Sequence, residues 1–223
     1  MTNTKSRLTT KTLVLASLFC AIAYITVVLF RIPVVSILKY EPKNVIITLA
    51  GLIIGPISTV FISIVVSFIE MVTISDNGLY GMFMNIIATI SFTLPISIIY
   101  KHKRNINSAV IGLLIGTILM TLMMLLWNYI VSPFYFKMPR EAVADMLVPI
   151  FLPFNILKGA INSTLVFLLY KPIIFALRKS HSIPDSKSEM QVNKKSIILF
   201  NVCAFVILAV SIVICILWRI NQK

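Results

Sequence analysis

The sequence has little charge, and most of the charge it has is of one sign. Only 12% of its 223 residues are charged, whereas 59% are hydrophobic. A soluble domain has about a quarter of its residues charged. Lys and Arg number 20 against 7 Asp and Glu, which gives a formal net charge of +13. This composition excludes a water-soluble enzyme and predicts a polytopic membrane protein.

Other absences narrow the chemistry. The three cysteines (Cys20, Cys203 and Cys215) form no CxxC pair and have no histidine at metal-ligand spacing, so neither a disulfide framework nor a metal site is predicted. No Walker A sequence is present, so the chain is not expected to bind ATP by itself. Hydrolase motifs and close intramembrane carboxylate pairs are also missing, and no catalytic residue is predicted. The excess of positive charge is attributed to residues that flank membrane spans, and no nucleic-acid partner is expected.

Apolar runs predict seven membrane-spanning helices in an all-α protein. The expected spans are 12–30, a short one ending near 54, 57–73, 82–100, 108–131, 147–170 with a possible helical tail to 178, and 196–218. An amphipathic connection is expected between the fifth and the sixth. Residues 1–178 should thus form a six-helix membrane domain, 179–195 a cytoplasmic linker rich in Ser, Lys and Asp, and 196–223 an extra C-terminal transmembrane helix.

The division between the second and third spans depends on Gly55-Pro56. Residues 45–73 as one helix would be about 43 Å long, too long for a hydrocarbon core of about 30 Å. Proline removes a backbone donor and clashes with the preceding turn, so a break is predicted there, with a single kinked helix as the alternative. The positive charges do not fix the orientation, because twelve Lys and Arg lie on one side and seven on the other in either direction.

Polar side chains inside the spans mark a candidate binding site, because they are costly in a membrane. Asn155, Lys158 and Asn162 have the spacing i, i+3 and i+7, which places them on one face of the sixth predicted helix. A role in a ligand cavity is favoured for Lys158, although its side chain could instead extend to the membrane surface through the break at Pro149 and Pro153.

Three further residues bear on this site. Asn128 lies in Trp127-Asn128-Tyr129, which belongs either to a cavity or to an interfacial aromatic belt. Asn85 could join the same cavity, whereas Glu70 is expected at the water boundary. Amides, one ammonium and aromatic rings suit a polar, planar, uncharged or weakly anionic small molecule.

Several short motifs occur in a recognisable order. They are Leu38-Lys39-Tyr40-Glu41-Pro42, the Gly55-Pro56 break, Trp127-Asn128-Tyr129 followed by Pro133-x-Tyr135, Met138-Pro139-Arg140-Glu141-Ala142-Val143, and Pro153-Phe154-Asn155-Ile156-Leu157-Lys158-Gly159. Together, over about residues 8–177, they resemble the riboflavin-specific substrate-binding (S) component of energy-coupling factor (ECF) vitamin transporters. The resemblance implies a six-helix bundle in the cell membrane with both its ends cytoplasmic. It also implies that flavin enters from outside, beneath the loop around residues 38–42.

The resemblance further implies a transported ligand, riboflavin or a close flavin, and no cofactor. Asn128, Asn155 and Lys158 match the flavin-contacting positions, and Tyr40, Asn85 and Leu38 are further candidates. The implied protein partners are a transmembrane T subunit and two ATPase subunits. The seventh span departs from the family.

The first helix carries Ser17-x-x-x-Ala21, where the family has small residues that contact the T subunit. Small residues at this spacing also serve ordinary helix packing, and Ala16 and Cys20 form a second such pair one residue earlier. Two alternative functions stay open: an S component for another vitamin or modified base, and a stand-alone ion-coupled carrier or membrane enzyme.

Overall fold

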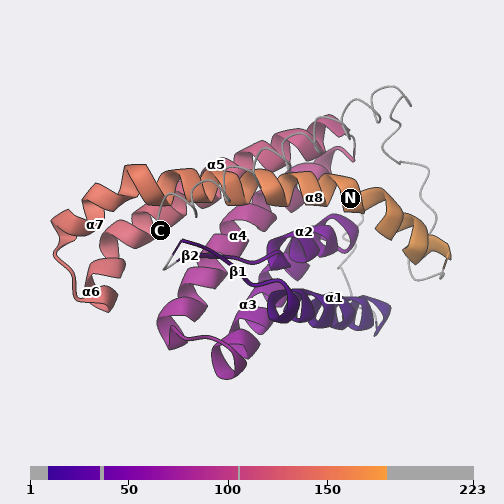
Figure 1. Ribbon diagram of the computed structural model, residues 1–223. Coiled ribbons are helices and arrows are strands. Elements are labelled where there is room, and N and C mark those ends of the chain that lie inside the picture. Colours follow the sequence, from indigo (N-terminus) through magenta and orange to yellow (C-terminus); the bar gives the residue numbers. More distant parts are fainter. Residues whose placement is uncertain (1–9, 36–37, 105, 180–223) are drawn as a thin grey trace, which may run out of the picture.

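Helices make up almost all of the part of the chain that the structure describes (Figure 1). This computed structural model describes residues 10–35, 38–104 and 106–179. In chain order the elements are α1 (Thr10–Leu29), β1 (Ile32–Val35), β2 (Leu38–Tyr40), α2 (Lys43–Ile53), α3 (Pro56–Thr73), α4 (Gly78–His102), α5 (Ile106–Ile130), α6 (Ser132–Phe136), α7 (Arg140–Met146), the π-helical turn η1 (Leu147–Phe151) and α8 (Leu152–Lys179). Apart from Lys179, the predicted linker at 179–195 and the predicted span at 196–223 lie outside the described residues.

The expected all-α membrane architecture is confirmed. Five helical segments of the described part are long and apolar enough to cross a membrane: α1, α3, α4, most of α5, and the segment 140–176, which includes most of α8. Helix α2 is different, because its 11 residues rise only about 16 Å. The predicted short second span is therefore a helix that is too short to cross a bilayer core of about 30 Å by itself.

The chain breaks between α2 and α3 as Gly55-Pro56 predicts, and the single kinked helix is wrong. Gly55 has φ +134°, a conformation that residues with a Cβ rarely adopt. Pro56 then occupies the first helical position of α3, where its missing N–H would have no partner in any case. The break lets α2 and α3 separate and pack as independent helices.

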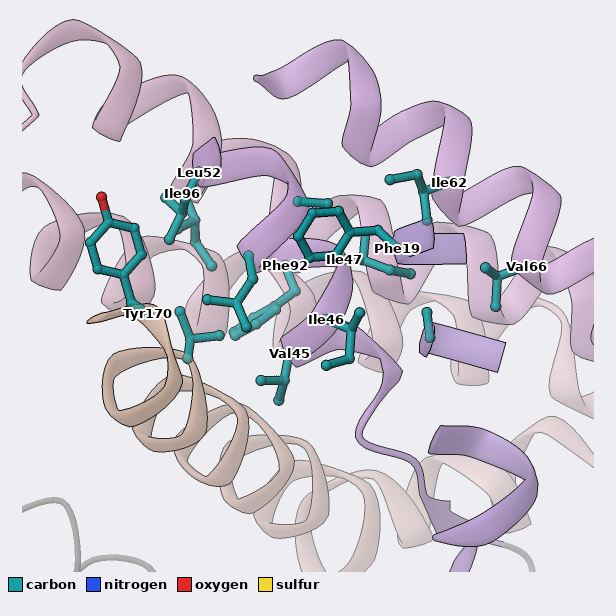
Figure 2. Close-up of a cluster of buried hydrophobic side chains, with 14 of the residues drawn as sticks. Phe19, Val45, Ile46, Ile47, Leu52, Ile62, Val66, Phe92, Ile96 and Tyr170 are labelled. Atoms are coloured by element: carbon teal, nitrogen blue, oxygen red, sulfur yellow. The ribbon is translucent and has the colours of Figure 1, made fainter. Parts of the chain in front are cut away.

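Helix α2 is the centre of the apolar core. Every residue from 43 to 52 is buried, and the helix packs against α1, α3, α4 and α8. Figure 2 shows this packing, with the α2 side chains surrounded by Phe19 of α1, Ile62 and Val66 of α3, Phe92 and Ile96 of α4, and Tyr170 of α8. Large apolar side chains also cover the outer faces of the longer helices, as expected for surfaces in contact with lipid.

The contact between α2 and its neighbours is closest at Gly51. A Cβ placed on this residue would lie 2.0 Å from Ser97 Oγ and 2.2 Å from Thr59 Cγ2. We expect Gly51→Ala to lower the free energy of unfolding by about 1–3 kcal/mol through overpacking, measured as thermal unfolding in detergent. Adding Thr59→Ser and Ser97→Ala, which remove the two clashing atoms, should recover part of that loss. Unchanged stability of Gly51→Ala would contradict this packing.

Two connections differ from the expected loops. The segment before α2 forms an antiparallel hairpin, in which Ile32 pairs with Tyr40 and Pro33 with Lys39. The amphipathic connection after α5 contains the short helices α6 and α7, and it continues through η1 directly into α8. In Figure 1, α6 and α7 lie at one end of the bundle.

Candidate functional site

A cavity of about 270 Å³ lies between the hairpin and the helices. This volume is close to the lower end of the range for small-molecule sites, about 300–1,000 Å³. The lining residues come from the hairpin, the α3–α4 loop, α4, α5, α6 and α8. Most of them carry polar or charged side chains, and the apolar part of the wall consists of Leu38, Met84, Ala88, Met124, Phe136 and Phe154. The cavity is therefore suited to a small molecule with several polar groups.

The structure brings five of the six predicted substrate residues to this cavity: Leu38, Asn85, Asn128, Asn155 and Lys158. Tyr40 does not line it. Its hydroxyl instead donates a buried hydrogen bond to Oδ1 of Asn162, at 2.9 Å. The polar face predicted on the sixth helix is thus divided, since Asn155 and Lys158 reach the cavity whereas Asn162 anchors the hairpin to α8.

Hydrogen bonds to nearby residues hold two asparagines of the cavity wall in place, Asn128 of α5 and Asn155 of α8. Asn128 donates from Nδ2 to the carbonyl oxygen of Met124 at 2.7 Å, and its Oδ1 accepts from Ser132 at 2.8 Å. Asn155 donates to the carbonyl oxygen of Phe151 at 2.8 Å. Both amides are therefore fixed before a ligand binds, which reduces the entropy cost of binding.

The aromatic residues beside Asn128 point in different directions. Trp127 lies against Tyr80 of α4, with ring centroids 5.7 Å apart, and Tyr80 stacks on Tyr135 of α6 at 4.0 Å. Tyr129 is exposed and lies under the guanidinium of Arg140, which is 5.6 Å from the ring centroid. Trp127-Asn128-Tyr129 thus contributes one residue to the cavity, one to an aromatic cluster and one to the outer surface.

Lys158 differs from the other cations around the cavity. Its side chain is partly buried and lines the cavity, and within the described part of the chain its ammonium forms no hydrogen bond or ion pair. Lys39, by contrast, pairs with Asp76 of the α3–α4 loop at 2.7 Å, and this contact holds the pKa of Asp76 below its usual value. Lys158 is therefore available to bind a ligand.

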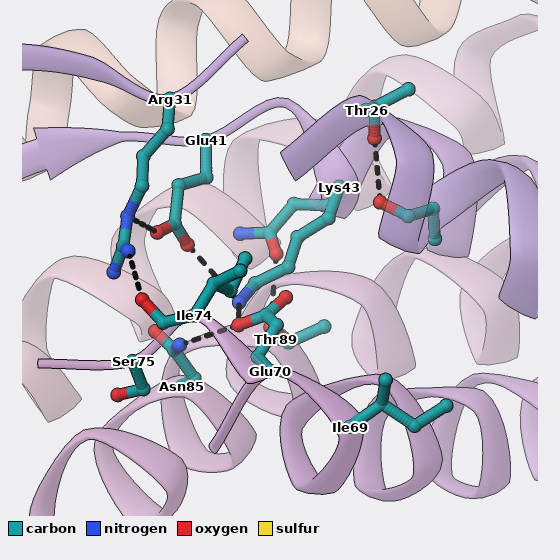
Figure 3. Close-up of polar contacts among 12 residues, drawn as sticks. Thr26, Arg31, Glu41, Lys43, Ile69, Glu70, Ile74, Ser75, Asn85 and Thr89 are labelled. Carbon is teal, nitrogen blue, oxygen red and sulfur yellow. Dashed lines mark hydrogen bonds and ion pairs between the residues drawn. The ribbon is translucent and has the colours of Figure 1, made fainter. Parts of the chain in front are cut away.

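Glu70 was predicted to lie at the water boundary, and this prediction is wrong because the residue is buried. Its side chain is only 3% exposed, and it pairs with Lys43 of α2, which is 1% exposed. Lys43 also contacts Oε2 of Glu41 at 3.1 Å. Arg31 lies 3.0 Å from the other oxygen of Glu41 and donates to the carbonyl of Ile74 at 2.8 Å. Figure 3 shows how these contacts connect the hairpin region, α2 and α3.

The buried ions leave one positive charge in excess. The cations that act on the charge of Glu41 are, in decreasing order of their effect, Lys43, Lys158 and Arg31. Burial by itself raises the pKa of Glu41, but these charges outweigh burial and hold that pKa below its usual value. Arg31, Glu41, Lys43 and Glu70 balance one another, so the excess charge is that of Lys158. This network was not predicted from the sequence, although Glu41 and Lys43 on either side of Pro42 were a signal.

The two predicted T-subunit contacts lie away from the cavity. Ser17 and Ala21 are both exposed on α1, and the Ser17 hydroxyl donates to the carbonyl of Leu13 at 3.0 Å. Ala16 and Cys20, the other pair of small residues, are buried in the core. The exposed pair is therefore free to contact another helix, and the buried pair serves packing within the bundle.

Comparisons with known proteins agree with one another. Residues 11–170 match the family described as "ECF transporter, substrate-specific component". The chain is 32% identical over 177 residues to riboflavin transporter RibU of Staphylococcus aureus (strain TCH60), covering 76% of this chain and 93% of the relative. It is 29% identical over 185 residues to riboflavin transporter FmnP of Bacillus subtilis (strain 168), covering 77% and 97%. The fold is similar to a solved S component of a bacterial ECF transporter, with a TM-score of 0.63, 30% identity, and coverage of 75% of this chain and 98% of that one.

Proposed function

The chain belongs to the family of substrate-specific components of ECF transporters, and on this basis we propose that it captures riboflavin or a close flavin outside the cell. It is a binding and transport protein, not an enzyme, and the flavin is its cargo. The observation that carries the proposal is the meeting of Asn128, Asn155 and Lys158 at one cavity. The pyrimidine edge of a flavin offers carbonyl acceptors and an imide donor, which amides and an ammonium can satisfy.

The position of the cavity supports an orientation. Helix α4 begins near the cavity, where Gly81 and Asn85 line it, and ends at His102 in the cluster 101–104, which carries three Lys and Arg. Positive clusters of this kind favour the cytoplasmic side of a membrane. The cavity then opens outward, and the N-terminus is cytoplasmic, since α1 ends at Leu29 on the cavity side, two residues before Arg31, which lines the cavity.

The proposed partners are a transmembrane T subunit and two ATPase subunits, which would supply the energy for delivery. The exposed pair Ser17 and Ala21 on α1 is the proposed contact with the T subunit, because small side chains let two helices approach closely in a membrane. Flavin uptake that persisted without any ATPase partner would contradict this part of the proposal and favour an ion-coupled carrier.

Purified protein should bind riboflavin, and Asn128→Ala should weaken that binding about tenfold. The substitution removes a buried amide that lines the cavity, and with it the proposed hydrogen bond to the flavin, which contributes roughly 0.5–1.5 kcal/mol. Binding is measured by flavin absorbance of the purified protein and by titration of flavin fluorescence. Asn107→Ala is the matched control, since Asn107 is exposed at the start of the same helix. Purified protein that carries another vitamin and does not bind riboflavin would overturn the proposed cargo.

A further inference from the structure

Glu70 lies directly behind the cavity wall. It does not line the cavity itself, but it contacts Asn85, which does. Asn85 donates from Nδ2 to Oε2 of Glu70 at 2.9 Å, and the ammonium of Lys43 donates to the same oxygen. The other carboxyl oxygen, Oε1, is buried and has no hydrogen-bond partner among the described residues. A single oxygen atom of Glu70 therefore holds both the ammonium and the amide (Figure 3).

This arrangement determines which end of the Asn85 amide faces the cavity. An ammonium can only donate, so the oxygen that Lys43 contacts must be an acceptor, whether or not Glu70 is ionised. Only the NH₂ group of Asn85 can satisfy the same oxygen. The carbonyl oxygen of Asn85 is therefore turned away from Glu70.

The carbonyl oxygen of Asn85 has no partner within the protein as far as the structure describes it. Within residues 10–35, 38–104 and 106–179 it accepts no hydrogen bond, and it is not among the fully buried polar atoms that lack a partner. Asn85 as a whole is partly buried and lines the cavity. The free carbonyl is thus placed where a ligand can reach it.

We infer that Glu70 is a positioning residue of the binding site: it holds Asn85 so that the amide carbonyl accepts a hydrogen bond from a donor group of the ligand. This inference rests on the proposed function and adds a rule of specificity to it. Lys158 can only donate hydrogen bonds, so it recognises acceptors of the ligand, whereas the carbonyl oxygen of Asn85 recognises a donor. In a flavin the available donors are the imide N–H and the ribityl hydroxyls.

Removing the acceptor at position 70 should reverse the amide. In Glu70→Met, the charged group nearest to Asn85 is the ammonium of Lys43, which donates, so the amide oxygen turns toward it. The NH₂ group then faces the cavity, where it repels the ligand's donor. We expect Glu70→Met to weaken riboflavin binding about tenfold. Glu70→Gln keeps an acceptor at the same place and should bind riboflavin like the unsubstituted protein.

The decisive test is a double-mutant cycle with Asn85→Ala, using riboflavin dissociation constants of the purified protein. If Glu70 acts through Asn85, then Glu70→Met has less than about a twofold effect once Asn85 is alanine. Equal effects in both backgrounds would overturn the inference and leave the proposed function intact. Failure of the unsubstituted protein to bind riboflavin would overturn both.

Two further variants distinguish the expected loss of affinity from a general loss of structure. Ser67→Ala changes a buried residue of α3 that does not line the cavity, and it should leave the affinity unchanged. If Glu70→Met is too unstable to purify, Lys43→Met/Glu70→Met is the alternative. It removes the acceptor and the ammonium together, so no buried lysine is left without its partner. In this double variant neither an acceptor nor an ammonium fixes the Asn85 amide, so its orientation is lost but not reversed; it should bind riboflavin about two- to fivefold more weakly, less than the loss in Glu70→Met, and full affinity in it would overturn the inference.

Discussion

Replacing Lys158 by alanine is expected to weaken riboflavin binding by about 10- to 100-fold, because a hydrogen bond to a charged group contributes roughly 1.5–3 kcal/mol. Lys158 is the cation of the cavity wall that has no ion-pair partner within the described residues, and in the proposed site its ammonium donates to acceptors of the ligand. The flavin carbonyls would lose this donor, and the cavity would lose its excess positive charge.

The loss should be confined to binding. Arg31, Glu41, Lys43 and Glu70 balance one another without Lys158, so the substitution leaves no additional buried charge unpaired among the described residues. Thermal unfolding of the ligand-free protein should therefore change little. The measurement is a fluorescence titration with riboflavin, with Lys103→Ala as the control, because Lys103 is exposed at the opposite end of α4. Unchanged affinity in Lys158→Ala would remove this residue from the proposed site.

Lys158→Met separates charge from packing. Methionine preserves most of the aliphatic stem but not the ammonium. It should bind riboflavin as weakly as the alanine variant if the charge is responsible. Recovery of affinity in Lys158→Met would show that the stem contributes by contact alone.

The sequence was informative wherever the signal was local. The break at Gly55-Pro56 follows from the chemistry of two adjacent residues, and Asn155 and Lys158 could be placed on one helix face from their spacing. Asn162 shows the limit of that argument. It shares the same face, but the hairpin approaches it, so its amide binds Tyr40 and stays outside the cavity.

Contacts between distant segments could not be predicted in this way. Glu70 stands at the end of an apolar run, where hydropathy alone favours the water boundary. Its burial depends on Lys43, which is 27 residues away in the sequence and begins the central helix. The hairpin was missed for a related reason, since strands of four and three residues, one of them containing Pro33, are too short to show an alternating pattern.

The same network gives the largest expected effect on stability. Lys43→Met should lower the free energy of unfolding by about 3–5 kcal/mol, because it leaves the buried carboxylate of Glu70 without a cation. The carboxylate of Glu41 is destabilised less, since it keeps its contact with Arg31. The measurement is unfolding in detergent, by heat or by a denaturant titration, in the absence of ligand.

A second substitution distinguishes the cost of an unpaired charge from the loss of the lysine side chain. In Lys43→Met/Glu70→Gln both charges are gone, and the amide introduced at position 70 still offers an acceptor to Asn85. Replacement of a buried ion pair by neutral groups is often close to neutral, so most of the lost stability should return. Lys39→Met, which breaks the exposed pair with Asp76, should have little effect. If the double variant were as unstable as Lys43→Met alone, the loss of the lysine side chain from its packing against the neighbours of α2, and not the unpaired charge of Glu70, would account for the lost stability.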